Sequence, residues 1–189
     1  MKVIGITGLM GSGKSEVCKI IKKLYKVPII YSDKIAKYIY KIDERVKQKI
    51  FNKFGKEIKT GENKIDIKRL REIVIKDEKK LDELEQIIHP EIYKKEKEII
   101  KFFKRKKKYK FLVIENAILF KVDSKLCDII ILVKTSEKIR QKRTKKNKKN
   151  LFTKRQKNII INKINFIITN NGSKKELEEK VKKIIEKIK

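Results

Sequence analysis

The stretch GITGLMGSGKS near the N-terminus combines four glycines with a lysine and two serines. Gly8, Gly13, Lys14 and Ser15 match the spacing G-x-x-x-x-G-K-S, which is typical of phosphate-binding loops that join a strand to a helix. The glycines leave no side chains in the turn, so the backbone amides of residues 11–16 can face phosphate oxygens. Lys14 can then reach the β- and γ-phosphates, and the hydroxyl of Ser15 can bind Mg²⁺. The pattern predicts a nucleoside triphosphate site, with contacts from Gly8, Gly11, Ser12, Gly13, Lys14, Ser15 and Glu16.

Two carboxylates follow apolar runs and are candidates for chemistry at the same edge of a sheet. Asp33 comes shortly after VPII, and Glu115 ends FLVIE. In an open α/β sheet, ligands bind at the carboxyl ends of the strands. We expect Asp33 to orient the group that attacks the γ-phosphate; the alternative, capping a helix that begins at Lys34, is compatible with that role. Glu115 is a candidate to hold Mg²⁺ through water or to contact the acceptor, and its alternative is a structural carboxylate.

Apolar runs and turn signals predict the elements that must position these residues. Strands alternate with helices, which predicts parallel strands in an open three-layer α/β fold with a five-stranded sheet. The predicted strands span 2–6, 27–30, 111–115, 128–133 and the first part of 165–173. Helices are expected over 13–24, after a cap at Ser32 or Asp33, over 44–104 with breaks at FGKEIKTGEN and His89-Pro90, over 137–164, and after a Ser173–Glu176 capping box. Pro90 is expected to begin a new helix.

Composition indicates one folded domain. The chain has 189 residues, 40% of them hydrophobic, and lacks the run of about 18 apolar residues that a membrane span requires. We expect a core of about 1–33, 106–139 and 160–189, a helical acceptor lobe of about 34–105 and a short basic lid of about 140–159. Cys18 and Cys127 lack metal-ligand spacing and the N-terminus is predicted to be a strand, so we expect a cytoplasmic protein.

The formal net charge of +30 comes from 47 lysines and only seven arginines, spread over every segment. Proteins that read nucleic acids favour arginine, because its guanidinium group pairs bidentately with bases and phosphates. The joint excess of lysine, isoleucine and asparagine indicates instead a nucleotide bias of the genome. We therefore expect no specific nucleic-acid partner, and a polyanion-binding surface stays open as the alternative.

Several further motifs occur in an order that resembles dephospho-CoA kinases along nearly the whole chain. IGITGLMGSGKS is similar to the family's opening TGGIGSGKS, YSDKIAK to D-A-D-x-I-A, and LEQIIHPEIYKK to L-E-x-I-x-H-P. FLVIENAILF, CDIIILV and NFIITNNGS fall where that family has its third strand and loop, its fourth strand, and A-D-x-V-I-D-N-x-G. The resemblance is specific because the motifs surround the phosphate loop in this order and spacing.

The resemblance implies a transferase that moves the γ-phosphate of ATP to the ribose 3′-hydroxyl of dephospho-CoA, the last step of coenzyme A synthesis. ATP is then a substrate and Mg²⁺ the metal cofactor. Asp33 would orient the hydroxyl, while Lys14 and the lid residue Arg143 would stabilise charge on the transferring phosphoryl group. The turn at Asn170, Asn171 and Gly172 would border the adenine of ATP, with contacts from Asn171 and Gly172.

Other residues of the lid and the lobe have weaker assignments. Arg140, one helical turn before Arg143, is the less favoured partner for the phosphates. His89, the only histidine, is expected to cap the helix that begins at Pro90 or to line the acceptor lobe. The lid lysines are expected to be solvated and to attract polyphosphate loosely. They are Lys145, Lys146, Lys148 and Lys149.

The chain departs from the family's pattern at several positions. An aspartate, an arginine, a proline, a glutamate and a second lid arginine are usual where this chain has Tyr31, Ile67, Ala117, Lys121 and Asn147. Aspartates are also usual at the positions of Glu115, Asn165 and Thr169. Since the phosphate loop and Asp33 are intact, we predict a working, monomeric enzyme with ATP and dephospho-CoA as substrates and no membrane partner. The alternatives are another small-molecule kinase with a nucleoside, nucleotide or shikimate-like acceptor, a nucleic-acid-binding protein with residual ATP binding, and an inactive remnant.

Overall fold

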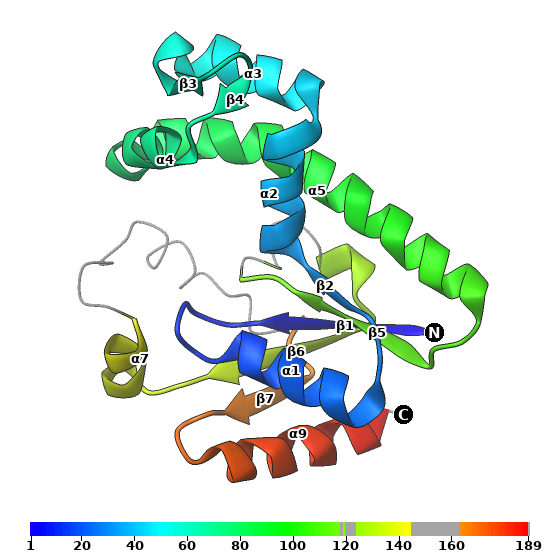
Figure 1. Cartoon of the computed structure of the whole chain (residues 1–189). Helices are drawn as coiled ribbons and strands as arrows, with labels where there is room; N and C mark the ends of the chain where they lie inside the picture. The colour runs from blue at the N-terminus through cyan, green and yellow to red at the C-terminus, as the bar shows by residue number, and fades with distance from the viewer. Residues whose placement is uncertain (118, 120–123, 145–162, 189) are drawn as a thin grey trace. The chain divides into compact units, whose positions relative to one another are not determined.

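The structure is a computed structural model that describes residues 1–117, 119, 124–144 and 163–188 (Figure 1). The chain divides into two compact units. One comprises Met1–Tyr31 and Lys97–Lys189, and the other comprises Ser32–Glu96. The phosphate loop and the parallel strands belong to the first unit, and Asp33 belongs to the second.

A parallel sheet in the order β2-β5-β1-β6-β7 is the centre of the first unit, as far as the chain is described. Its strands confirm the five predicted ones: β1 (Lys2–Thr7), β2 (Ile29–Tyr31), β5 (Phe111–Glu115), β6 (Ile129–Lys134) and β7 (Phe166–Thr169). β2 begins later than expected, at Ile29. Pro28 before it has no N–H to donate and contributes only its carbonyl, which accepts from the amide of Val113 at 3.1 Å. Because all strands are parallel, their carboxyl ends meet at one edge of the sheet.

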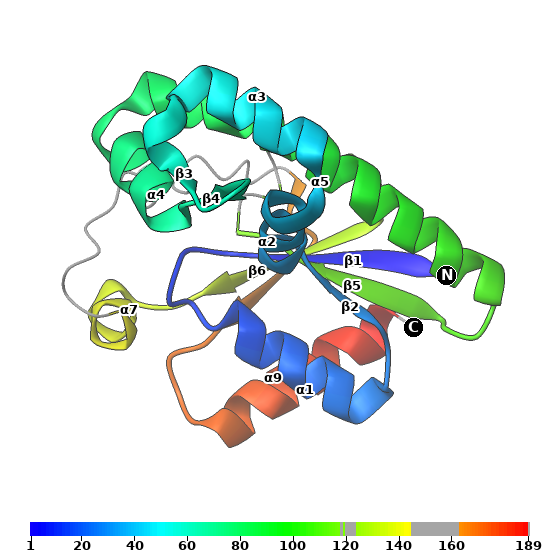
Figure 2. The same ribbon diagram turned by 45° about the horizontal axis from the view of Figure 1, so that its top comes forward.

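Helices α1 (Lys14–Tyr25) and α9 (Lys174–Ile188) lie side by side against one face of this sheet (Figures 1 and 2). The predicted capping box at the start of α9 is confirmed, since the amide of Glu176 donates to Oγ of Ser173 at 3.2 Å and the amide of Ser173 donates to Oε1 of Glu176 at 3.4 Å. One face of this helix is apolar and buried, with Ile184 only partly so; it consists of Leu177, Val181, Ile184, Ile185 and Ile188. The core beneath the two helices consists of Ile4, Ile6, Val17, Cys18, Ile20, Ile21, Val27, Phe111, Val113, Ile131, Val133, Ile168, Leu177, Val181, Ile185 and Ile188.

The other face of the sheet is buried as well. Leu112, Ile114, Ile130 and Leu132 alternate with the core residues along β5 and β6, and all are buried. A Cβ on Gly5 of β1 would lie 2.5 Å from Cδ2 of Leu119 and 2.8 Å from Sγ of Cys127. Burial on both faces explains why these strands are continuous apolar runs.

The second unit is mainly helical. Its elements are α2 (Ser32–Ile42), α3 (Glu44–Phe54), the short helix η1 (Lys56–Ile58), a hairpin of β3 (Lys59–Thr60) and β4 (Lys64–Ile65), α4 (Ile67–Lys76) and the first part of α5 (Glu78–Lys106). Aspartates 43, 66 and 77 precede α3, α4 and α5, and each accepts hydrogen bonds from backbone amides of the first helical turn. The sequence predicted a break at FGKEIKTGEN but not this hairpin.

The prediction that His89-Pro90 interrupts the helix is wrong, because α5 continues through Pro90 without a break. Pro90 begins no new helix, and His89 therefore caps none. A proline inside a helix loses one hydrogen bond and costs about 3 kcal/mol. Leu81, Leu84, Ile88 and Ile92 all lie on one buried face on both sides of the proline. Their burial, at about 1.5–3 kcal/mol each, outweighs the cost of the proline.

Of the helix predicted over 137–164, the structure contains α7 (Glu137–Arg143), which ends earlier than expected because Thr144 has extended backbone angles. Most of the predicted lid, including Asn147 and the four lid lysines, lies outside the described residues, as does Lys121. Among the described helices none combines the length and apolar character that a membrane span requires.

Candidate active site

The loop between β1 and α1 has a backbone that requires glycine. Gly8, Gly11 and Gly13 have φ angles of 148°, 79° and 96°, in the region that residues with side chains avoid. Gly13 is the residue before the first turn of α1, and no side chain caps that turn. A Cβ on Gly13 would collide with Nδ2 of Asn170. The loop therefore keeps this tight course only with glycine.

Backbone amides at the start of α1 are available for an anion. Within the loop, the amide of Ser12 donates to the carbonyl of Leu9 at 3.0 Å, and the amide of Glu16 donates to the carbonyl of Gly13 at 3.1 Å. These two predicted phosphate donors are thus used internally. The amides of Gly11, Gly13 and Ser15 form no hydrogen bond with the residues that the structure describes. They lie at the positive end of the helix dipole, where phosphate is favoured.

Lys14 and Glu16, on the first turn of α1, point to different surroundings. Nζ of Lys14 donates to the carbonyls of Gly8 at 2.9 Å and Leu9 at 3.3 Å, so its ammonium group lies over the loop. Glu16 instead pairs with Lys174 at the start of α9 at 2.7 Å, and that hydrogen bond holds the pKa of Glu16 below its ordinary value of 4.5. Among the predicted ATP contacts, the side chain of Lys14 is therefore placed for phosphate and that of Glu16 is engaged elsewhere.

Ser15 and Glu115 meet at the carboxyl edge of the sheet. Oγ of Ser15 donates to Oε1 of Glu115 at 2.7 Å. Glu115 ends β5 opposite Ile6 of β1, the strand that enters the loop. Oε2 of Glu115 is buried and has no hydrogen-bond partner among the described residues. A hydroxyl and a partly unsatisfied carboxylate fit Mg²⁺, which takes one or two protein oxygens together with phosphate and water.

Helix α7 packs directly on the loop. A Cβ on Gly11 would lie 3.0 Å from Cγ and 3.2 Å from the carbonyl oxygen of Arg140. A Cβ on Gly13 would lie 3.7 Å from Nη1 of Arg143. The structure therefore places both arginines of α7 beside the glycines that were expected to hold phosphate.

The loops that follow β6 and β7 hold the phosphate loop in place through hydrogen bonds to Ser12. The carbonyl of Ser12 accepts from Oγ1 of Thr135 at 2.8 Å and from Nδ2 of Asn170 at 2.9 Å. Thr135 follows β6, and Asn170, which is only 6% exposed, follows β7. Next to them, Oδ1 of Asn171 accepts from the amide of Ser136 at 2.8 Å. This network connects the predicted adenine turn at 171–172 to the loop.

The chain is similar to known proteins along nearly its whole length. A family model described as dephospho-CoA kinase matches residues 2–180. A dephospho-CoA kinase of Borreliella burgdorferi is 35% identical over an alignment 202 residues long, which covers 97% of this chain and 94% of that relative. The chain belongs to the dephospho-CoA kinase family. As a member of this family it is a kinase, and the resemblance predicted from the sequence motifs is confirmed.

Solved structures agree with this assignment. The dephospho-CoA kinase from Campylobacter jejuni matches with a TM-score of 0.71 and 26% identity, covering 98% of this chain and 96% of that one. The shikimate kinase from Acinetobacter baumannii shares the fold with a TM-score of 0.51 at 16% identity. The predicted P-loop α/β fold of the dephospho-CoA kinase family is therefore confirmed.

Asp33, the predicted orienting residue of the dephospho-CoA kinase reaction, is an exposed residue in the first turn of α2. It caps no helix at Lys34, because α2 already begins at Ser32. Its carboxylate makes no hydrogen bond or ion pair with the described residues. The neighbouring Ser32 is buried and donates a 2.5 Å hydrogen bond to Oε1 of Glu96 on α5. Asp33 is thus held by its helix while its carboxylate stays available.

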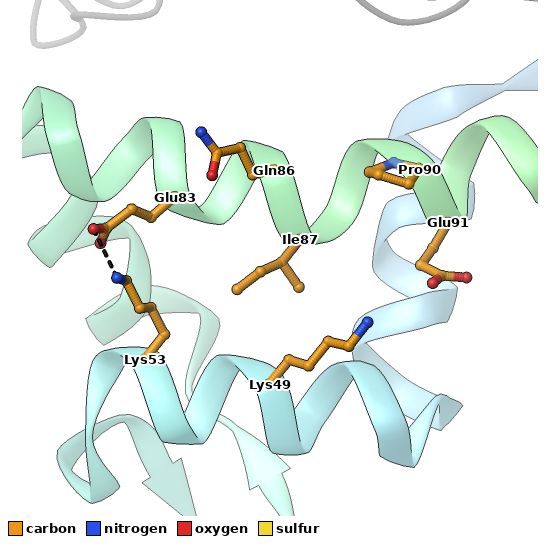
Figure 3. Close-up of a pocket in the computed structure, with 7 residues that line it drawn as sticks. All are labelled: Lys49, Lys53, Glu83, Gln86, Ile87, Pro90 and Glu91. Atoms are coloured by element: carbon orange, nitrogen blue, oxygen red, sulfur yellow. Dashed lines mark ion pairs between the residues drawn. The ribbon is translucent and has the colours of Figure 1, made fainter.

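The second unit contains a cavity of about 290 Å³ between α3 and α5 (Figure 3). None of the predicted site residues lines it. The ion pair of Lys53 with Glu83, 2.8 Å long, joins the two helices at one end (Figure 3). The lining residues are Lys49, Lys53, Glu83, Gln86, Ile87, Pro90 and Glu91.

Two residues at these sites had no assigned role in the sequence interpretation, and a third had a different one. Asn170 was expected only as part of the turn that borders the adenine, and its side chain instead donates to the carbonyl of Ser12 in the phosphate loop. Thr135 and Glu96 carried no signal, because each acts through a partner more than 60 positions away in the chain. Such contacts depend on the tertiary fold and not on local spacing.

Proposed function

We propose that this protein transfers the γ-phosphate of ATP to the ribose 3′-hydroxyl of dephospho-CoA and so forms coenzyme A. The observation that carries the proposal is the phosphate loop with Lys14 over it, in a chain that the dephospho-CoA kinase model matches from residue 2 to 180. ATP and dephospho-CoA are the substrates, and the reaction is proposed to take place in the cytoplasm with the protein as a monomer.

The triphosphate is proposed to bind to the loop. Amides of Gly11, Gly13 and Ser15 would donate to its oxygens, with Gly8, Ser12 and Glu16 forming the remainder of the loop. Asn171 and Gly172 would border the adenine. Their attachment to Ser136 and, through Asn170, to Ser12 supports a rigid path from base to phosphate.

The chemistry is proposed to depend on three side chains. Asp33 accepts a hydrogen bond from the 3′-hydroxyl and orients its oxygen in line with the γ-phosphate, since a loose transition state depends on positioning more than on deprotonation. Lys14 and Arg143 stabilise the charge on the transferring group. The carboxylate of Asp33 is exposed and unpaired among the described residues, which supports its proposed role with the hydroxyl. The position of Arg143 beside Gly13 supports its proposed role with the transferring phosphoryl group.

Mg²⁺ is the proposed cofactor, held by the hydroxyl of Ser15 with Glu115 nearby. When bound, it would neutralise charge on the β- and γ-phosphates. The described residues contain no cluster of three or more metal-ligating side chains. This fits an ion that takes most of its ligands from phosphate and water.

A coupled assay with ATP and a set of acceptors tests the proposal. We expect dephospho-CoA to be phosphorylated, and shikimate and free nucleosides not to be. Asp33→Asn should lower kcat by roughly 10²–10⁴-fold, the usual range for a group that positions or accepts a proton. Glu72→Gln, which neutralises another exposed acid of the same unit, is the matched control and should leave kcat unchanged. An unchanged kcat in Asp33→Asn would remove this residue from the chemistry.

A further inference from the structure

Arg140 is a buried cation next to the phosphate loop. The residue is 9% exposed, and only 11% of its side chain is accessible. The side chains of Arg45 and Arg69, by comparison, are 77% and 63% accessible. Arginine keeps its charge at every physiological pH, and a buried charge destabilises a protein unless an anion compensates it. A compensating anion is therefore expected close to the guanidinium group of Arg140.

The described residues provide little of that compensation. Nη2 of Arg140 lies 3.9 Å from Oε1 of Glu137, beyond hydrogen-bond distance, and the side chain of Glu137 is 72% exposed. No other ion pair of Arg140 is formed within the described part of the chain. The sequence contains no acidic residue between Glu137 and Glu176. The local anions thus leave this guanidinium group poorly paired.

The backbone of Arg140 is fixed against the loop. Its carbonyl accepts from the amide of Thr144 at 3.0 Å and from the hydroxyl of Thr144 at 2.8 Å. Cγ and the carbonyl oxygen lie at 3.0 and 3.2 Å from the position of a Cβ on Gly11. Arg143, one helical turn further, approaches Gly13. The base of the side chain is held in place, and within the described part of the chain its guanidinium end is restrained only by the distant contact with Glu137.

We propose that Arg140 binds the polyphosphate of ATP alongside Arg143, so that the anion missing from the protein is supplied by the substrate. This inference rests on the proposed ATP-dependent function and adds a second arginine to its phosphate site. The guanidinium group leaves Glu137 and donates two hydrogen bonds to phosphate oxygens, a geometry that lysine cannot reproduce. Arg140 is in this role a binding residue for the triphosphate and makes no contact with the acceptor.

Calorimetric binding to the full chain tests the inference, with inorganic tripolyphosphate, ATP and adenosine as probes. Arg140→Met should weaken tripolyphosphate and ATP binding about 10- to 100-fold, the range for lost hydrogen bonds to charged groups, and leave adenosine binding unchanged. Arg140→Lys should recover part of the loss. Arg105→Met, which removes an exposed arginine of α5, controls for net charge and should change each affinity less than about twofold.

Thermal unfolding without ligand separates this role from a structural one. Because Arg140 is poorly paired, Arg140→Met should keep or raise the Tm. A lowered Tm together with wild-type affinity for tripolyphosphate would overturn the inference, and so would an equal loss of adenosine binding. Arg140→Gln gives the same comparison if the methionine variant does not fold. The proposed function is tested separately by the wild-type protein: absence of dephospho-CoA phosphorylation refutes that function, whereas the Arg140 variants test only phosphate binding.

Discussion

The hydroxyl of Ser15 donates a 2.7 Å hydrogen bond to Oε1 of Glu115, a residue 100 positions away in the chain. The parallel pairing of β1 with β5 brings the two together, because Ile6, near the end of β1, lies opposite Glu115. A helix start that offers amides and a hydroxyl thus faces a carboxylate with one unsatisfied oxygen. Substitutions at either residue should therefore affect the proposed Mg²⁺ site.

Variants of this pair should change the Mg²⁺ requirement of the kinase reaction. Glu115→Gln keeps the shape but removes the charge, and should raise the Mg²⁺ concentration for half-maximal activity about 10- to 100-fold. Ser15→Ala removes the proposed direct ligand and should lower kcat at every Mg²⁺ concentration. Activity measured over a Mg²⁺ titration checks both. Glu179→Gln on the exposed face of α9 is the control, and identical titration curves for all variants would contradict the metal assignment.

Gly13→Ala should disable the phosphate loop. The alanine Cβ would meet Nδ2 of Asn170, and a φ of 96° is strained for any residue with a side chain. We expect a loss of about 1–3 kcal/mol in stability and a sharp rise of the KM for ATP. Gly61→Ala is the matched control: its φ is 59°, but nothing lies within 4 Å of the new methyl group. It should cost about 1–2 kcal/mol and leave the KM unchanged. A normal KM in Gly13→Ala would show that the loop tolerates a side chain.

Ser32 and Glu96 should be coupled in stability. Glu96 is 0% exposed, and the Ser32 hydroxyl donates to its Oε1 at 2.5 Å. Removing the hydroxyl therefore takes a hydrogen bond away from a buried carboxyl oxygen. Ser32→Ala should lower the free energy of unfolding by about 1–3 kcal/mol. In a double-mutant cycle with Glu96→Gln, urea unfolding should give a coupling energy of at least about 0.5 kcal/mol. Thr60→Ala, which removes an exposed hydroxyl of the same unit, should stay within about 0.5 kcal/mol of wild type. Additive effects would contradict the coupling.

Because of Cys18, the free energy of unfolding should decrease at alkaline pH. Burial, followed by the nearby Glu115, raises the pKa of the Cys18 thiol above its ordinary value of 9.0. The folded state therefore keeps a proton that the unfolded state loses, so this contribution to stability is complete below pH 9 and falls as the pH rises above it. The loss should be about 1.4 kcal/mol per pH unit. Urea unfolding at pH 8 and pH 10 should show a larger decrease for wild type than for Cys18→Ala. Equal decreases would exclude the thiol as the cause.

Local patterns predicted the parts of the fold that depend on local chemistry. The glycine spacing predicted the phosphate loop, alternation of strands and helices predicted the parallel sheet, and the Ser173–Glu176 spacing predicted a cap that the structure contains. These features follow from residues within a few positions of one another, whose backbone requirements do not depend on the rest of the chain.

At Pro90, tertiary packing outweighs the local preference of proline for the start of a helix. Its missing N–H favours a helix start, but the buried face formed by Leu81, Leu84, Ile88 and Ile92 gains more from one continuous helix. The hairpin of β3 and β4 was missed because strands of two residues are too short to show a period. Packing, and not propensity, decided the course of the helix at Pro90.

The sequence by itself determined that this chain has a phosphate loop, a five-stranded parallel sheet and the motifs of the dephospho-CoA kinase family. Only the tertiary structure decided which side chains meet there: Glu115 with Ser15, Asn170 and Thr135 with Ser12, and the two arginines of α7 with Gly11 and Gly13. The physical reason is that glycine conformations and apolar periods are set within a few residues. Hydrogen bonds and buried charges depend on distances that exist only after strands far apart in the sequence have paired.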